Sequence, residues 1–105
     1  MNFRTMKALT TAALAGNAAY TMPSVKVEMF NKIRGKVVAD QAGSLAFQQS
    51  DDNVTWDTLT TTAVSANTPL KFEEQCYCNY FRAVYTNGAT LQGSFRLSIY
   101  ADPFS

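Results

Sequence analysis

The sequence predicts an all-β protein: an antiparallel β-sandwich, jelly-roll or immunoglobulin-like, with about seven to eight strands. From Tyr20 to Tyr100, apolar and polar residues alternate with a period of two, which is the spacing of a strand with one buried face. Turn-forming residues cut this alternation into short segments, and no segment of crossover-helix length follows any of them. The 105 residues suffice for one domain with a modest core.

Seven segments carry the alternation. They cover residues 24–30, 32–39, 44–50, 54–60, 69–75, 80–86 and 94–101. Their boundaries are Pro23, Gly35, Gly43, Asp51-Asp52-Asn53, Pro69, Asn87-Gly88 and Gly93. Asn87-Gly88 is a dipeptide typical of a type I′ hairpin turn. We expect the core to contain Phe47, Trp56, Phe72, Phe81, Phe95 and Leu97.

Residues 1–19 are predicted to form an N-terminal arm or short helix, ahead of a β-sandwich domain at residues 20–105. The apolar stretch of this segment is too diluted for a secretory signal, so we expect the segment to be retained. A helix of this length is marginal in water by itself. We therefore expect its apolar side chains to pack on a neighbouring subunit, with the sandwich of the same chain as the alternative. They are Phe3, Met6, Leu9 and Leu14.

The composition argues against enzymatic chemistry. No histidine is present, which removes the commonest general base and the commonest metal ligand. The chain also lacks a serine-centred elbow, a glycine-rich phosphate loop and a pair of separated acids. We therefore expect no enzyme, no cofactor and no metal site.

The charge distribution argues against nucleic acid. The net charge is +1, and the cluster Lys26, Lys32, Arg34 and Lys36 contains Glu28 and no nucleic-acid-binding motif. The first twenty residues are too short and too polar to cross a bilayer, so we expect no membrane partner. Cys76 and Cys78 are predicted to be reduced thiols on one strand face, as in a protein assembled in a cytoplasm.

Two acids stand between alternating segments, in Ser50-Asp51-Asp52-Asn53. Asp and Asn favour turns because their short side chains bond to nearby amides and tolerate positive φ. A calcium site needs six to eight oxygen ligands, and catalytic acids must face each other across a cleft, whereas adjacent turn residues diverge. We interpret the run as a hairpin turn, with calcium binding and catalysis as the alternatives.

Trp56 and Arg82 each allow two interpretations. Trp56 is expected to cover one end of the core, and the alternative is an exposed platform for a sugar ring. Arg82 is expected to pair with Asp57 or Glu73, and the alternative is that it lines a pocket.

Two stretches carry a resemblance to a known family. They are "SLAFQQSDDNVTWDTL" and "CNYFRAVYTNGATLQGSFRLSIYA", within Gly43 to Ala101. The first resembles a "Gln-x-Ser-x-Asp-Gly-x-x-Trp" pattern and the second a "Tyr-Val-Arg … Tyr-Thr-Asn-Gly" run, both met in small β-sandwich virion structural proteins of tailed bacteriophages. The same signature occurs in discoidin-like and carbohydrate-binding jelly rolls. Asn53 stands where the pattern has Gly, and Asn is the next residue to tolerate positive φ.

The resemblance implies a non-enzymatic virion subunit, assembled in the host cytoplasm, that packs against copies of itself and other virion proteins. Capsid decoration (cement), head-fibre and tail accessory subunits are the roles it covers. A homo-oligomer is the default for such a subunit. The alternative is a carbohydrate-binding or adhesin module for a host-surface glycan. In that case we expect Trp56, Arg82 and Tyr85 to contact the glycan.

Overall fold

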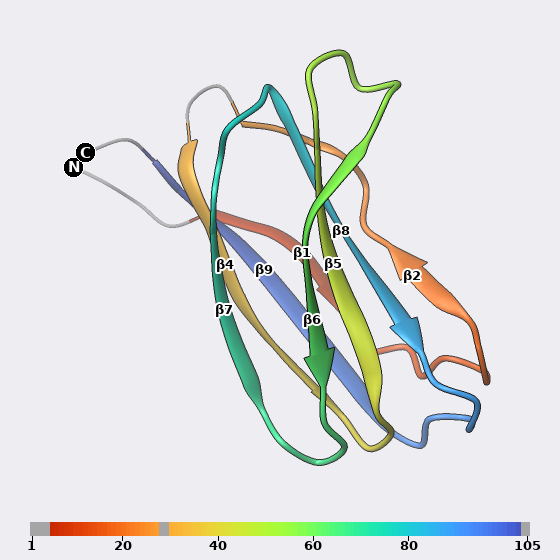
Figure 1. The fold of residues 1–105 in the computed structure, drawn as a ribbon. Coiled ribbons are helices and arrows are strands. Elements are labelled where there is room, and N and C mark those ends of the chain that lie inside the picture. Colours follow the sequence, from red (N-terminus) through yellow and green to blue (C-terminus); the bar gives the residue numbers. More distant parts are fainter. Residues whose placement is uncertain (1–4, 28–29, 104–105) are drawn as a thin grey trace.

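The computed structural model describes residues 5–27 and 30–103, which form nine β-strands in two antiparallel sheets (Figure 1). The strands of sheet A, in spatial order, are β1 (Thr5–Thr10), β9 (Phe95–Pro103), β4 (Phe30–Ala39) and β7 (Leu70–Gln75). Those of sheet B are β2 (Ala19–Thr21), β8 (Tyr80–Asn87), β5 (Gly43–Ser50) and β6 (Asp57–Val64), with β3 (Val25–Lys26) also pairing with β8. The described residues contain no helix, and so none that could span a membrane.

The strand order is that of a jelly roll, because consecutive strands mostly lie in opposite sheets. Only β2–β3 and β5–β6 are consecutive strands within one sheet. The predicted all-β sandwich is therefore confirmed, with one strand more than the upper estimate.

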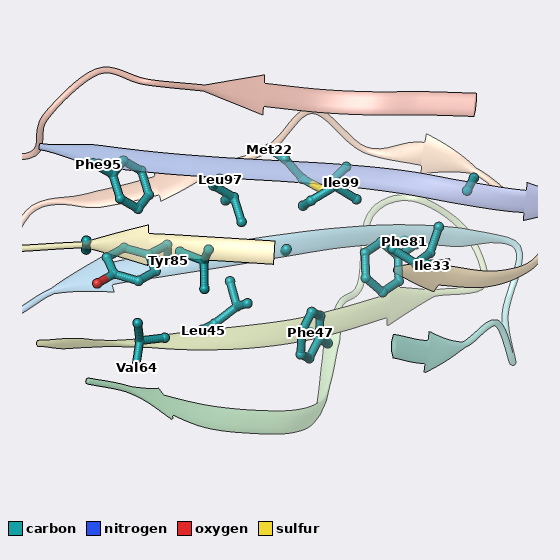
Figure 2. Packing of buried hydrophobic residues seen from close by; sticks show 14 of the residues in the cluster. Met22, Ile33, Leu45, Phe47, Val64, Phe81, Tyr85, Phe95, Leu97 and Ile99 are labelled. Carbon is teal, nitrogen blue, oxygen red and sulfur yellow. The ribbon is translucent and has the colours of Figure 1, made fainter. Parts of the chain in front are cut away.

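The core lies between the two sheets and is built from the inward residues of each strand (Figure 2). Strand β8 contributes Phe81, Ala83 and Tyr85, all fully buried, and β9 contributes Leu97 and Ile99 in the same way. The period-two alternation produces this division, since successive side chains of a strand point to opposite faces.

Aromatic rings occupy both ends of this core. Phe47 packs against Phe72 with ring centroids 5.0 Å apart, and Tyr85 packs against Phe95 at 4.7 Å. Of the six core residues expected from sequence, Phe47, Phe81, Phe95 and Leu97 are buried, and Phe72 is partly buried against them. The prediction was wrong for Trp56, which is not part of the buried cluster.

Part of the N-terminal segment is a strand, which excludes the short helix for residues 5–10 and leaves the alternative of an extended arm. Residues 5–10 form β1, which pairs antiparallel with β9 from Thr5 opposite Ala101 to Thr10 opposite Leu97. This pairing satisfies backbone groups along one side of the segment. A helix of six residues would gain little, because nucleation is costly and short helices are marginal.

The four apolar residues of that segment have different positions. Leu14, in the loop after β1, is partly buried against the core of its own chain. Leu9 is 56% exposed. Met6 lies opposite Tyr100 in the register of β1 and β9, and Phe3 lies outside the described residues. Packing of this segment on a neighbour stays a prediction for the residues other than Leu14.

The predicted type I′ turn at Asn87-Gly88 was wrong. Strand β8 ends at Asn87 and the chain crosses to β9 in the other sheet, which a two-residue turn cannot reach. The Asn87 amide group instead donates to the carbonyl oxygens of Leu14, Ala15 and Thr90. The non-glycine residues with positive φ are elsewhere, at Asn17, Asn53 and Asn67.

Gly35 permits the close approach of β4 to its neighbours. A Cβ at this position would overlap the backbone carbonyl of Ser98 and the ring of Phe72. At Gly93, by contrast, a Cβ would meet only the carboxylate end of Asp40, which is able to move.

We expect Gly35→Ala to lower the free energy of unfolding by about 1–3 kcal/mol, the usual cost of overpacking. Gly93→Ala is the matched control, and its effect should stay within about 1 kcal/mol. Urea denaturation followed by circular dichroism measures both. Equal effects of the two substitutions would contradict the close approach at Gly35.

Candidate binding surfaces

The loop that joins β5 and β6 projects from one end of the sandwich (Figure 1), and the acidic run lies at its start. Asp52 accepts hydrogen bonds at Oδ1 from the backbone amides of Val54 and Thr55, at 2.9 and 2.8 Å, and from the Ser50 hydroxyl at 3.0 Å. Ser50 Oγ also accepts from the amide of Asn53 at 2.9 Å. The predicted turn is confirmed, because these bonds are internal to it.

Two of these backbone amides affect the pKa of the Asp52 carboxyl. The bonds from Thr55 and Val54 hold the pKa of the Asp52 carboxyl below its ordinary value. Asn53 has a φ of 63°, as expected for a residue standing where glycine is usual. Within the described residues, no three His, Cys, Asp or Glu side chains gather as a metal ion requires.

A polar row crosses the outer face of sheet B beside this hairpin. The Arg82 guanidinium lies over the Trp56 ring, with Cζ 4.3 Å from the ring centroid. Arg82 Nε donates to Gln48 Oε1 at 2.6 Å, and Gln48 Nε2 donates to Thr58 Oγ1 at 3.0 Å. These side chains come from β8, β5, β6 and the loop between β5 and β6.

This row corrects two expectations. Arg82 pairs with Gln48 and Trp56 rather than with Asp57 or Glu73, because Gln48 is its direct cross-strand neighbour. The expected glycan contacts are also divided. Trp56 and Arg82 share the outer face, whereas Tyr85 is fully buried on the inner face, where burial raises the pKa of its hydroxyl.

The outer face of sheet A carries a different chemistry, which surrounds a depression of about 740 Å³. The residues lining it come from the three neighbouring strands β9, β4 and β7. They are Arg34, Gly35, Lys36, Lys71, Phe72, Glu73, Ser98 and Tyr100.

Some of the cations on this face are paired with acids. Lys32 Nζ lies 3.0 Å from Glu73 Oε1, and Arg34 bonds both Glu73 and Asp102. The hydrogen bond and charge of Lys32, followed by the charge of Arg34, hold the pKa of the Glu73 carboxyl below its ordinary value. Among the described residues, this network uses both acids of the outer face, Glu73 and Asp102.

Three other cations on the same face have no acidic ion-pair partner among the described residues. Lys36 stands directly opposite Lys71 in the register of β4 and β7. Ser98 of β9 is the direct partner of Lys36, and Arg96 lies two residues before Ser98, so Arg96 is a diagonal neighbour of Lys36. Among the described residues, no ion pair joins Lys36, Lys71 or Arg96 to an acid. Like charges placed opposite each other across a ladder are destabilising.

The two cysteines are free, but they lie after the end of β7 rather than on a strand. The buried side chain of Gln49 holds this connection, accepting from the amides of Tyr77 and Cys78 and donating to the carbonyl of Gln75. Burial raises the pKa of the Cys76 thiol to about 11, which keeps it protonated at neutral pH.

The edges of the two sheets differ in how they are protected. Strand β7 carries Lys71, Glu73 and Glu74, β1 contains a register shift, and β2 and β3 are three and two residues long around Pro23. Charges, irregularities, short strands and proline all hinder pairing with another chain.

Strand β6 has little of this protection. From Thr58 to Val64 it carries no charge and no proline, and most of these residues are exposed. Its irregularity lies near its start, where Thr58 and Thr60 oppose consecutive residues of β5. Among the described strands, β6 pairs with β5 alone.

Together, these features define a class of protein: a jelly-roll β-sandwich whose polar and charged side chains lie on its outer faces and edges. The family model described as "Uncharacterised protein YqxG N-terminal domain" matches residues 1–102, and the chain belongs to this family. One relative is named as a protein of a phage-like element, and this is the part of the expected resemblance to phage proteins that the comparisons bear out. The resemblance to discoidin-like modules stays a prediction.

Two relatives come from Bacillus subtilis (strain 168). Uncharacterized protein YqxG and Phage-like element PBSX protein XepA are each 32% identical to this chain over 94 residues. The match covers 85% of this chain but only 31% of YqxG and 33% of XepA. The chain therefore spans about a third of the length of these relatives.

Solved structures show the same fold. The crystal structure of PBSX exported protein XepA superposes with a TM-score of 0.87 and 25% identity, over 98% of this chain and 38% of that one. A Bacillus endospore appendage, from a family of disulfide-linked pili, superposes with a TM-score of 0.61 and 14% identity, over 99% of this chain and 89% of that one. The appendage supports the fold alone.

Sequence reasoning found part of these surfaces. It singled out Trp56 and Arg82, and the cluster that includes Lys36, but not Lys71 or Ser98. Lys71 lies 35 positions from Lys36 in the sequence and joins it only through the β4–β7 pairing. The alternation shows that each lysine occupies a polar, outward-facing position of its own segment, and this was the information in the sequence that could have indicated the cluster.

The turn makes a pH-dependent contribution to stability. Because the folded pKa of Asp52 is depressed, its contribution is fully present above the ordinary carboxyl value of 3.8 and is lost as the pH falls through the folded value. We expect Asp52→Asn to remove this part of the pH dependence, measured by urea denaturation between pH 6 and pH 2. Asp51→Asn is the matched control. If the two variants had the same pH profile, the role assigned to Asp52 would be wrong.

Proposed function

We propose that this chain is a non-enzymatic structural module of a phage or phage-like element, which acts by packing against other copies of itself. The resemblance to XepA, named as part of a phage-like element, supports the association with phage. Capsid decoration, head-fibre and tail accessory roles, and a place in the virion with assembly in the host cytoplasm, remain within this proposal.

The observation that carries the proposal is the unprotected edge of β6. An edge strand presents a row of backbone N–H and C=O groups that can pair with a strand of another chain. The exposed threonines of β6 favour strand conformation, and no charge opposes a second strand beside them. The other edges carry the protection that this one lacks.

Several polar side chains form hydrogen bonds within the chain itself, and this supports a structural role. Asp52 is bonded by the amides of its own turn, and Gln49 and Asn87 are bonded to backbone groups of connecting loops. These side chains hold the loops in one conformation. A module that works by packing needs such rigid surfaces, because ordering a loop on association costs free energy.

We expect Thr61→Lys to abolish self-association, because its charge would oppose a second strand at β6. Sedimentation velocity over about 1–200 μM should show concentration-dependent association for the parent chain and a monomer for the variant. Thr86→Lys is the matched control. It adds the same charge on the outer face of sheet B, but on the central strand β8.

Two outcomes would count against assembly through β6. One is a parent chain that stays monomeric over the whole range. The other is an equal loss of association in the two lysine variants.

A glycan-binding module is the second candidate, and the Trp56 ring favours it. Trp56 is partly exposed on the outer face of sheet B, with Arg82 over one side of the ring and Gln48 beside it. An aromatic ring flanked by donors is a platform on which a sugar ring can stack.

Trp56 is the only tryptophan, so its fluorescence reports directly on this surface. If a glycan binds there, titration with host-surface polysaccharide should shift the emission of the parent chain, and Trp56→Ala should lose retention on a glycan column. Tyr77→Ala, at an exposed aromatic residue on the β7–β8 connection, is the control. Retention that survives Trp56→Ala would rule out this platform.

A further inference from the structure

We infer that the depression on the outer face of sheet A binds a phosphate group. This site is separate from the β6 edge and from the Trp56 platform, since it lies on the opposite sheet. The inference goes beyond the proposed function and does not depend on it.

Electrostatics give the first reason. Lys36 and Lys71 face each other across neighbouring strands, with Arg96 diagonal to Lys36, and no described acid pairs with them. The two acids of the face, Glu73 and Asp102, are already bonded by Arg34. An anion between the two lysines would replace a repulsion with two attractions.

A buried hydroxyl gives the second, independent reason. Ser98 lines the depression and is only 4% exposed, and its Oγ has no hydrogen-bond partner in the described structure. A buried polar group without a partner is costly, so the unpaired hydroxyl leaves a hydrogen-bonding position that a ligand in the depression could fill. Ser98 stands directly opposite Lys36 in the register of β9 and β4, so the hydroxyl and the lysine share one face.

The donor set favours phosphate over a carboxylate. Arg34, the arginine that lines the depression, is already paired with Glu73 and Asp102. The donors left over are the point charges of Lys36 and Lys71 and the hydroxyl of Ser98. They lie side by side on β7, β4 and β9 and present no planar fork of the kind that matches a carboxylate, whereas lysine binds phosphate as a point charge.

The size of the site leaves room for a carrier. A volume of about 740 Å³ exceeds what one phosphate fills. Phosphate carried on a polymer would fit as well as free inorganic phosphate. The experiment therefore includes both sources.

Calorimetric titration with sodium phosphate, against sodium chloride of equal ionic strength, tests the site in the parent chain. At about fivefold the measured Kd, phosphate should raise Tm by about 4–8 °C. Lys36→Gln with Lys71→Gln should weaken binding about tenfold or more. Lys26→Gln, on β3 of the other sheet, is the control for the single variant Lys71→Gln. Each substitution removes one positive charge, and only Lys71→Gln should weaken phosphate binding.

Ser98→Ala separates ligand binding from folding. Without phosphate, the Tm of this variant should equal or exceed that of the parent, since the hydroxyl has no partner to lose and its burial without one is costly. With phosphate, its affinity should fall about fivefold. The lack of any phosphate effect on the parent chain would overturn the inference, and so would equal weakening by Lys26→Gln and Lys71→Gln.

Polymers identify the source of the phosphate. Tighter binding of polyphosphate than of inorganic phosphate, per phosphate group, would support a polymer-borne ligand, and equal binding would support free phosphate. Polyglutamate of the same charge that bound as tightly as polyphosphate would overturn the preference for phosphate. A single-stranded oligonucleotide that bound more tightly than polyphosphate would overturn it in favour of nucleic acid.

Discussion

Contact between the inner faces of β8 and β9 is the interaction on which the rest of the sandwich depends. Strand β8 pairs with β5, β2 and β3, and β9 pairs with β1 and β4, so these two strands organise most of both sheets. Their inward side chains are fully buried, and the contact of Tyr85 with Phe95 at 4.7 Å joins the two layers directly. Burying each large side chain contributes roughly 1.5–3 kcal/mol before the cost of ordering.

Two buried amides extend this rigidity to the loops. Gln49 anchors the β7–β8 connection, and Asn87 anchors the segments before β2 and after β8. Each bonds backbone groups that would otherwise be buried without partners. The hairpin at Asp52 is fixed by its own amides in the same manner. The outer faces and edges are therefore presented by a framework with few freely moving parts.

The alternation of apolar residues predicts the fold class well, because burial of one face imposes a period of two on every strand. It does not indicate which strands become neighbours. The signal at Asn87-Gly88 is local, whereas the chain there must cross between sheets. Trp56 follows the turn directly, and its position depends on Arg82, which lies 26 residues later. The N-terminal segment joins β9, a partner that its own pattern cannot reveal.

The two sheets divide the surface chemistry between them. Sheet B has an outer face with a small polar row and an edge at β6 that carries no charge from Thr58 to Val64. The outer face of sheet A gathers Lys32, Arg34, Lys36, Lys71 and Arg96, and among the described residues Glu73 and Asp102 are its acids. A net charge of +1 conceals this asymmetry, since acids elsewhere in the chain balance the basic face. Strand addition at β6 would extend sheet B within its own plane. The basic face lies on the other layer and points away, so self-association and anion binding would use surfaces that do not compete.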